Sequence, residues 1–120
     1  MKTVLVVDDH ADNNEIVCKV LKRMGHRTLS APTGEAALAI LATEIPDLII
    51  LDAMMPGMNG AEVLRLIRAN EATATIPVIM HSAVADPEFH QNAVEKGAND
   101  FLVKSNFDLK AFEAMIAKYI

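Results

Sequence analysis

Residues 47–52 read DLIILD, so four consecutive aliphatic side chains stand between two carboxylates. An uninterrupted apolar run of this length is typical of a strand buried on both faces, as in a parallel sheet covered by helices. The runs VLVV at 4–7 and VIM at 78–80 have the same character, whereas a more mixed run at 26–31 suits an edge strand. We therefore predict five short strands, over residues 3–7, 26–31, 47–51, 77–81 and 100–103.

The segments between the predicted strands carry apolar side chains at helical spacing. One of these helices carries Val63, Leu64 and Ile67. The ends of the others are marked by Asp12 and Gly25, Thr33 and Pro46, Asp86 and Gly97, and a capping box over Ser105–Asp108. Strand and helix thus alternate five times. With right-handed crossovers, that order predicts a three-layer α/β sandwich: a doubly wound parallel sheet with five helices on its two faces.

Composition excludes several classes of protein. Apolar residues make up 52% of the 120 residues, which is too many for a disordered chain and enough for the core of one domain over residues 1–120. No apolar run approaches the roughly 18 residues of a membrane span. The net charge of −5 argues against non-specific nucleic-acid binding. A single cysteine, Cys18, rules out an intramolecular disulfide, favours the cytoplasm and is expected to be an unreactive thiol.

Polar groups stand in the sequence where the predicted strands end. They are Asp8 and Asp9 after the first strand, Asp52 after the third, Ser82 after the fourth and Lys104 after the fifth. Ligands of doubly wound folds bind at this carboxyl edge of the sheet. Three carboxylates there would repel one another unless a cation intervened. Oxygen ligands suit Mg²⁺ (or Mn²⁺), and the four histidines show no i,i+4 spacing, so we do not expect a histidine metal site.

Asp52 is the candidate nucleophile of this site, because carboxylates can form aspartyl-phosphate intermediates. Phosphoryl transfer asks a protein mainly for positioning and charge neutralisation, which Lys104, Ser82 and a metal could supply. Each residue alone also has an ordinary explanation. An aspartate after a strand often caps a helix or opens a turn, and a serine or lysine there can simply be solvated. Their joint occurrence at one sheet edge favours a binding site for an anion with several oxygens.

Four motifs cover essentially the whole chain: VLVVDD at 4–9, PDLIILDAMMPGMNG at 46–60, IPVIMHSA at 76–83 and GANDFLVK at 97–104. As a set in this order they resemble the receiver domain of two-component response regulators, of the stand-alone type found in chemotaxis regulators. The resemblance implies a five-stranded parallel sheet of order 2-1-3-4-5, the flavodoxin-like order. It also implies a phosphorelay partner, either a sensor histidine kinase or a histidine phosphotransfer protein.

The same resemblance implies a role for each site residue. Asp52 would accept the phosphoryl group from a phosphohistidine. Asp9 would bind Mg²⁺ directly, Asp8 largely through water, and Met54 through its backbone carbonyl. The domain would catalyse only its own phosphorylation and dephosphorylation and would have no other enzymatic activity.

The resemblance further implies a switch. Ser82 would hydrogen-bond a phosphoryl oxygen, Lys104 would pair with it, and Phe101 would turn inward as Ser82 moves. Phosphorylation would then shift the face formed by the helix expected from Asp86, the strand at 100–103 and the last helix. That face would control a downstream protein target, and the chain would be a monomer or a weak dimer through it.

Several positions depart from the family pattern. Ser105 replaces the usual cis proline, so either a costly cis bond is kept or the preceding lysine is placed differently. His81 replaces an aliphatic residue; we expect it to be partly exposed at the strand end, and the alternative is a pH-sensitive neighbour of Ser82. Met54 and Val84 offer no acid or amide to orient water, so we predict slow self-dephosphorylation.

Three other functions compete with a phospho-accepting module. An aspartate-dependent phosphatase would need a second acid two residues after Asp52, where this chain has Met54. A flavin-binding module would need a phosphate-cradling loop after the first strand, where Asp8 and Asp9 would repel the phosphate. A degenerate receiver that acts by binding alone is the third. The receiver pattern ends with the chain at 119–120, so we expect either a stand-alone receiver or one domain of a longer protein.

Overall fold

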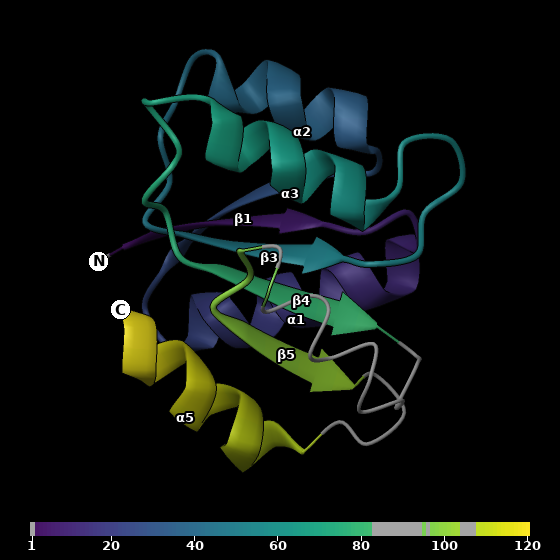
Figure 1. Cartoon of the computed structure of the whole chain (residues 1–120). Helices are drawn as coiled ribbons and strands as arrows, with labels where there is room; N and C mark the ends of the chain where they lie inside the picture. Colours follow the sequence, from purple (N-terminus) through teal and green to yellow (C-terminus); the bar gives the residue numbers. More distant parts are fainter. Residues whose placement is uncertain (1, 83–94, 96, 104–107) are drawn as a thin grey trace.

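Five parallel strands form one sheet in the order β2-β1-β3-β4-β5 at the centre of the computed structural model (Figure 1). The structure describes residues 2–82, 95, 97–103 and 108–120. The strands are β1 (Thr3–Val7), β2 (Arg27–Ala31), β3 (Leu48–Asp52), β4 (Val78–Ser82) and β5 (Asp100–Val103). The predicted parallel sheet and its order are therefore confirmed, and each strand begins and ends within one residue of its predicted bounds.

Helices cover both faces of this sheet. They are α1 (Ala11–Arg23), α2 (Gly34–Leu41), α3 (Gly60–Ala69) and α5 (Leu109–Tyr119). The part of the chain that the structure describes thus holds four helices where the sequence predicted five. The helix expected from Asp86 falls mainly on residues 83–94, outside the described residues. None of the described helices is long and apolar enough to cross a membrane.

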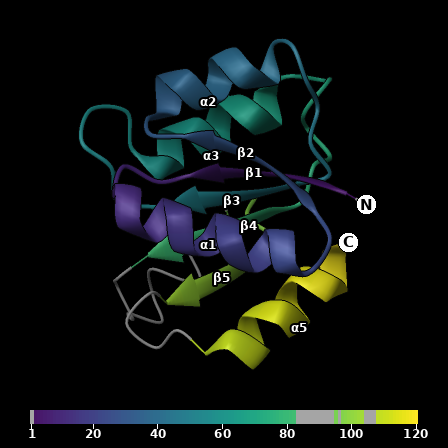
Figure 2. The same ribbon diagram turned by 180° about the vertical axis from the view of Figure 1, so that it is seen from behind.

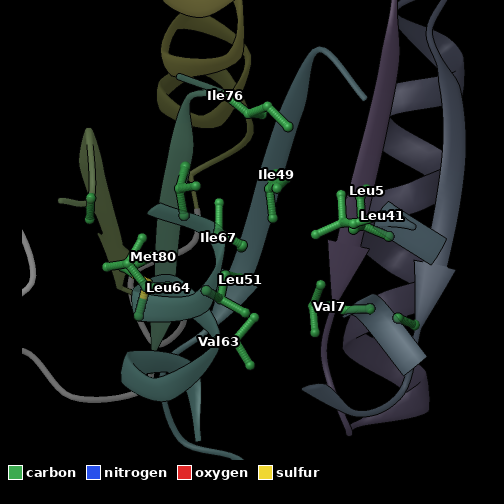
Figure 3. Close-up of a cluster of buried hydrophobic side chains, with 14 of the residues drawn as sticks. Leu5, Val7, Leu41, Ile49, Leu51, Val63, Leu64, Ile67, Ile76 and Met80 are labelled. Atoms are coloured by element: carbon green, nitrogen blue, oxygen red, sulfur yellow. The ribbon is translucent and has the colours of Figure 1, made fainter. Parts of the chain in front are cut away.

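Successive side chains of each strand point to opposite faces of the sheet and pack into two hydrophobic cores, one on each face. One face of the sheet packs against α2 and α3, and Figure 3 shows this core around Leu5, Ile49 and Met80. The opposite face, seen from the other side in Figure 2, packs against α1 and α5 through residues such as Val6 and Ile50. All five residues of β3 are buried, as the run at 47–52 predicted. Because β3 is packed on both of its faces, the position of Asp52 at the end of this strand is fixed as well.

The helix ends agree with the sequence in some places and differ in others. Thr33 caps α2 by accepting a hydrogen bond from the backbone of Ala36, and Gly25 ends α1 with a positive φ of 90°, both as predicted. The predicted cap Asp12 is wrong, because α1 begins one residue earlier, at Ala11, with His10 as its N-cap. The predicted capping box over Ser105–Asp108 is also wrong, because α5 begins at Leu109 with Asp108 itself as its N-cap, and the Asp108 side chain accepts hydrogen bonds from the backbone of residues 110 and 111.

Arg68 on α3 ties together segments that lie far apart in the sequence. Its guanidinium donates hydrogen bonds to the carbonyl oxygens of Ala74 (3.1 Å), Ile76 (2.7 Å) and Gly97 (3.0 Å), and to Asn99 Oδ1 (2.9 Å). Partial burial lowers the pKa of this guanidinium from its usual value. Arg68 thus holds the segment before β4 and the segment before β5 against α3.

Candidate functional site

The three predicted carboxylates meet at the carboxyl edge of the sheet. Strands β1 and β3 are neighbours, with Val7 opposite Leu51, so Asp8 and Asp52 follow directly side by side. One ligand atom from each of Asp8, Asp9, His10 and Asp52 lies within 4.8 Å of the others. The strand pairing therefore builds the acidic cluster that the sequence predicted.

The cluster is buried more deeply than surface acids usually are. Asp8 is 3% exposed and Asp52 is 2% exposed, while Asp9 is only partly exposed. Within the described residues, Asp9 Oδ1 is a buried atom with no hydrogen-bond partner. Burying several carboxylates together is costly unless positive charge or hydrogen bonds compensate them. A donor set of three carboxylates with an unsatisfied buried oxygen fits a divalent cation such as Mg²⁺.

Local hydrogen bonds hold two of these carboxylates in place. Asp8 Oδ1 accepts a hydrogen bond from the backbone N–H of His10 at 2.9 Å. Asp52 Oδ1 accepts one from the backbone N–H of Met54 at 3.1 Å. The Met54 side chain itself is 57% exposed. An exposed apolar side chain thus stands two residues after the candidate nucleophile.

Helix α3 begins directly behind Asp52. A Cβ atom built on Gly60 would overlap the carbonyl oxygen of Asp52 and would lie 2.7 Å from the Cα of Ala53. The backbone N–H of Gly60 donates a hydrogen bond to the carbonyl of Ala53 at 3.2 Å. Only glycine allows the first residue of α3 to approach so closely, and this contact supports the end of β3.

The end of β4 brings two further predicted residues to the site edge. Ser82 is fully buried, and His81 is the cross-strand partner of Asp52. His81 is 4% exposed, so the expectation that it is partly exposed is wrong. The register explains this burial: Ile50 and Ile79 pair two residues earlier in the same core, so Asp52 and His81 continue that face of the sheet. The alternative of a pH-sensitive neighbour of Ser82 stays a prediction.

The remaining predicted residues lie on or beyond β5. Phe101 is half-buried, pairs with Met80 across the strands and packs against the core under α2 and α3. Its role as a switch stays a prediction. Lys104, Val84 and Ser105 lie outside the described residues, so the predictions about their roles also stay predictions.

Two residues at the site were not found by sequence reasoning. His10 lies with its Nδ1 atom 3.2 Å from Asp9 Oδ1 and 3.4 Å from Asp8 Oδ1, although no i,i+4 histidine spacing signals it. Asn14 is buried and donates from Nδ2 to the carbonyl of Asp8 at 3.2 Å, while its Oδ1 accepts from the Ser30 hydroxyl at 2.6 Å. Asn14 thus anchors the backbone of Asp8 to α1 and β2.

Comparison with known proteins gives the same family by three routes. The family model of the response regulator receiver domain matches residues 4–117. The phosphate regulon transcriptional regulatory protein PhoB of Pseudomonas aeruginosa is 37% identical over 103 residues, which are 86% of this chain and 45% of PhoB. The response regulator PleD of Caulobacter vibrioides is 37% identical over 109 residues, which are 91% of this chain and 24% of PleD. The chain thus spans less than half of either relative.

Solved structures agree. The chemotaxis protein CheY4 of Vibrio cholerae has a TM-score of 0.93 at 29% identity, covering 100% of this chain and 99% of that one. The receiver domain of the sensor histidine kinase PA1611 of Pseudomonas aeruginosa has a TM-score of 0.89 at 25% identity, covering 98% and 96%, and its structure holds a magnesium ion coordinated in the active site cleft. The chain belongs to the response regulator receiver domain family of two-component signalling.

Proposed function

We propose that this chain is a phospho-accepting signalling module in which Asp52 receives a phosphoryl group from a phosphohistidine. The observation that carries the proposal is the placement of Asp52, a carboxylate that is 2% exposed and clusters with Asp8, Asp9 and His10 within 4.8 Å. A cluster of buried carboxylates is expensive for the fold to hold, so its presence at a ligand-binding edge supports a function for it.

The residues that would hold Mg²⁺ (or Mn²⁺) are Asp9, Asp52 and, through water, Asp8, with the backbone carbonyl of Met54 as a further ligand. When bound, the ion would offset the charge of the carboxylates and of the phosphoryl oxygens. Asp9 supports this assignment best, because its Oδ1 atom is buried and makes no hydrogen bond within the described residues. The cost of that unsatisfied oxygen is removed once a cation lies beside it.

The chemical step forms one bond and breaks another. A carboxylate oxygen of Asp52 attacks the phosphorus of the phosphohistidine, an acyl phosphate forms, and the bond from phosphorus to the donor nitrogen breaks. The electron pair leaves with the donor imidazole, which takes up a proton. The Met54 N–H orients the Asp52 carboxylate by donating a hydrogen bond to Oδ1. We therefore assign Oδ2 as the oxygen that attacks the phosphorus. Water later hydrolyses the acyl phosphate, and the chain has no other catalytic activity.

Signalling follows from the new negative charge at Asp52. Ser82, buried at the end of β4, would donate its hydroxyl hydrogen to a phosphoryl oxygen, and Lys104 would pair with it. Phe101 would follow the movement of Ser82 and change the face that includes β5 and α5. A sensor histidine kinase or phosphotransfer protein would be the donor, and a protein that reads this face would be the target.

Phosphorylation by acetyl phosphate tests the proposal. Intact mass is measured with and without Mg²⁺ for the wild type, Asp52→Asn and Asp47→Asn. Asp47 is the matched control, because it is the other carboxylate that frames β3 and it is exposed at the opposite edge of the sheet. We expect one added phosphoryl group on the wild type and on Asp47→Asn, with Mg²⁺ only, and none on Asp52→Asn. No addition to the wild type, or equal addition to Asp52→Asn, overturns the proposal.

A further inference from the structure

The geometry points to His10 as a nitrogen ligand of the divalent-cation site, one that strengthens the preference of the site for transition ions such as Ni²⁺ and Zn²⁺ over Mg²⁺. The inference rests on the proposed function, because it concerns the same site. The inference goes beyond the proposed function because it assigns a ligand of a different chemical kind and a stronger selectivity than three carboxylates alone would give.

The imidazole faces all three carboxylates. His10 Nδ1 lies 3.2 Å from Asp9 Oδ1, 3.4 Å from Asp8 Oδ1 and 4.0 Å from Asp52 Oδ2. Two ligand atoms bound to one ion at about 2.1 Å each lie about 3.0–3.4 Å apart at octahedral or tetrahedral angles. The separation from Asp9 therefore fits two ligands of one ion, with little movement of the side chains.

The oxygen that most needs a cation is the one nearest to this nitrogen. Asp9 Oδ1 is buried without a hydrogen-bond partner in the described part of the chain, and His10 Nδ1 lies 3.2 Å from it. The His10 side chain is 63% exposed, so an ion can reach the nitrogen from solvent without opening the fold. One cation beside both atoms would satisfy the buried oxygen and bind the nitrogen.

The backbone of His10 is already fixed in place. It is the N-cap of α1 in an extended conformation, and its side chain makes no capping hydrogen bond. Its N–H donates to Asp8 Oδ1 at 2.9 Å, and its carbonyl accepts from the Asn14 N–H at 3.0 Å. Only the side-chain torsions of His10 remain to be ordered when an ion binds, so the entropic cost of recruiting the imidazole is small.

The donor set predicts the direction of selectivity. Mg²⁺ prefers oxygen ligands and gives up its water reluctantly, so a neutral imidazole adds little to its binding. Imidazole suits Ni²⁺, Cu²⁺ and Zn²⁺, and affinities for nitrogen and oxygen sites rise along the series from Mn²⁺ to Cu²⁺. Three carboxylates and one imidazole should therefore hold Ni²⁺ and Zn²⁺ more tightly than three carboxylates would.

Calorimetric titration of the metal-free chain, with any affinity tag removed, tests the inference. Mg²⁺ and Ni²⁺ are titrated separately into the wild type, His10→Asn and His26→Asn. His26 is the matched control, because its imidazole lies next to Lys2, before β2 and at the other edge of the sheet. We expect His10→Asn to weaken Ni²⁺ binding at least about tenfold while Mg²⁺ binding changes less than about threefold. His26→Asn should leave both affinities unchanged.

A spectroscopic readout gives an independent test of nitrogen ligation. Zn²⁺ should shift the side-chain ¹⁵N resonances of His10 in the wild type and leave those of His26 in place. Equal Ni²⁺ affinity in the wild type and His10→Asn, or His10 ¹⁵N resonances that do not shift when Zn²⁺ is added, would overturn the inference. Failure of the proposed function looks different: the wild type would then bind no Mg²⁺, or Asp9→Asn and Asp52→Asn would bind it as well as the wild type.

Discussion

Gly60 stands against the carbonyl oxygen of Asp52, so closely that a methyl group on Gly60 would overlap it. The first residue of α3 is thereby in contact with the end of the strand that carries the candidate phosphoacceptor. Any side chain at position 60 must move either the helix or the strand end. The contact couples the packing of α3 to the geometry of the site.

Gly60→Ala should lower the free energy of unfolding by about 1–3 kcal/mol, because the added methyl group overpacks the contact with the backbone of Asp52. This loss would outweigh the gain of up to about 1 kcal/mol that alanine normally brings inside a helix. The variant should also take up phosphate from acetyl phosphate more slowly, since the strand end has to shift. Urea denaturation and intact mass over time measure the two effects.

Gly25→Ala is the control for that prediction. Position 25 also requires a glycine, because its φ is 90°, but it lies between α1 and β2, at the edge of the sheet opposite the acidic cluster. We expect a comparable loss of stability, about 1 kcal/mol, and an unchanged rate of phosphorylation. Equal phosphorylation rates in the two variants would show that the contact at Gly60 does not influence the site.

Met54 should make the phosphorylated chain long-lived. Its side chain is 57% exposed two residues after Asp52 and has no group that could orient an attacking water. Met54→Asn would supply an amide and should shorten the lifetime about tenfold, below the 10²–10⁴-fold effect of a positioned general base. Ile45→Asn, an equally exposed apolar position elsewhere, should leave the lifetime as it is. A wild-type lifetime of only seconds would contradict the prediction.

Arg68 should be far more important for stability than its neighbour Arg65. Arg68→Lys removes a planar group that donates to four oxygens in two segments, and should cost about 2–4 kcal/mol of unfolding free energy. Arg65→Lys disturbs only an exposed pair with Glu62 and should cost less than about 0.5 kcal/mol. Denaturant titration of both variants checks the contrast, which similar losses would contradict.

Cys18 should react slowly with thiol reagents in the native chain. Burial raises the pKa of its thiol, an effect that the hydrogen bond with Thr28 and the charge of Lys22 only partly oppose. Because the native pKa lies above the unfolded one, the unfolding free energy should also decline as pH rises above about 8.5. A disulfide reagent at pH 8 should label the native chain much more slowly than the urea-unfolded one. Equal rates would contradict this prediction.

The sequence predicted the sheet well because its signal is local. Four aliphatic residues in a row at 48–51 have few alternatives to a strand buried on both faces, and the register of a parallel sheet then brings Asp8 beside Asp52. The start of α1 could not be read in the same way. Asp12 looks like a cap in the sequence, but the helix begins at Ala11 and the backbone N–H of His10 bonds to Asp8 Oδ1.

The two polar residues that sequence reasoning missed depend on contacts between elements. His10 carries no metal-binding spacing of its own, and it joins the cluster only because β1 and β3 pair and the chain turns sharply into α1. Asn14 sits at a helical position that faces the sheet, where a polar side chain would be unfavourable in isolation. Backbone carbonyls from β1 and β2 and the hydroxyl of Ser30 satisfy it, and none of these partners is visible in the local sequence.

The pairing of β1 with β3 determines when the acidic cluster is assembled during synthesis and folding of the chain. Asp8 leaves the ribosome well before Asp52, because α1, β2 and α2 lie between them in the sequence, and the two meet only when Val7 pairs with Leu51. Such a contact of high sequence separation forms late, after the entropy of a long loop has been lost. A nascent or locally unfolded chain would have no assembled acceptor site, so under the proposed function the uptake of a phosphoryl group would also report that the sheet has folded.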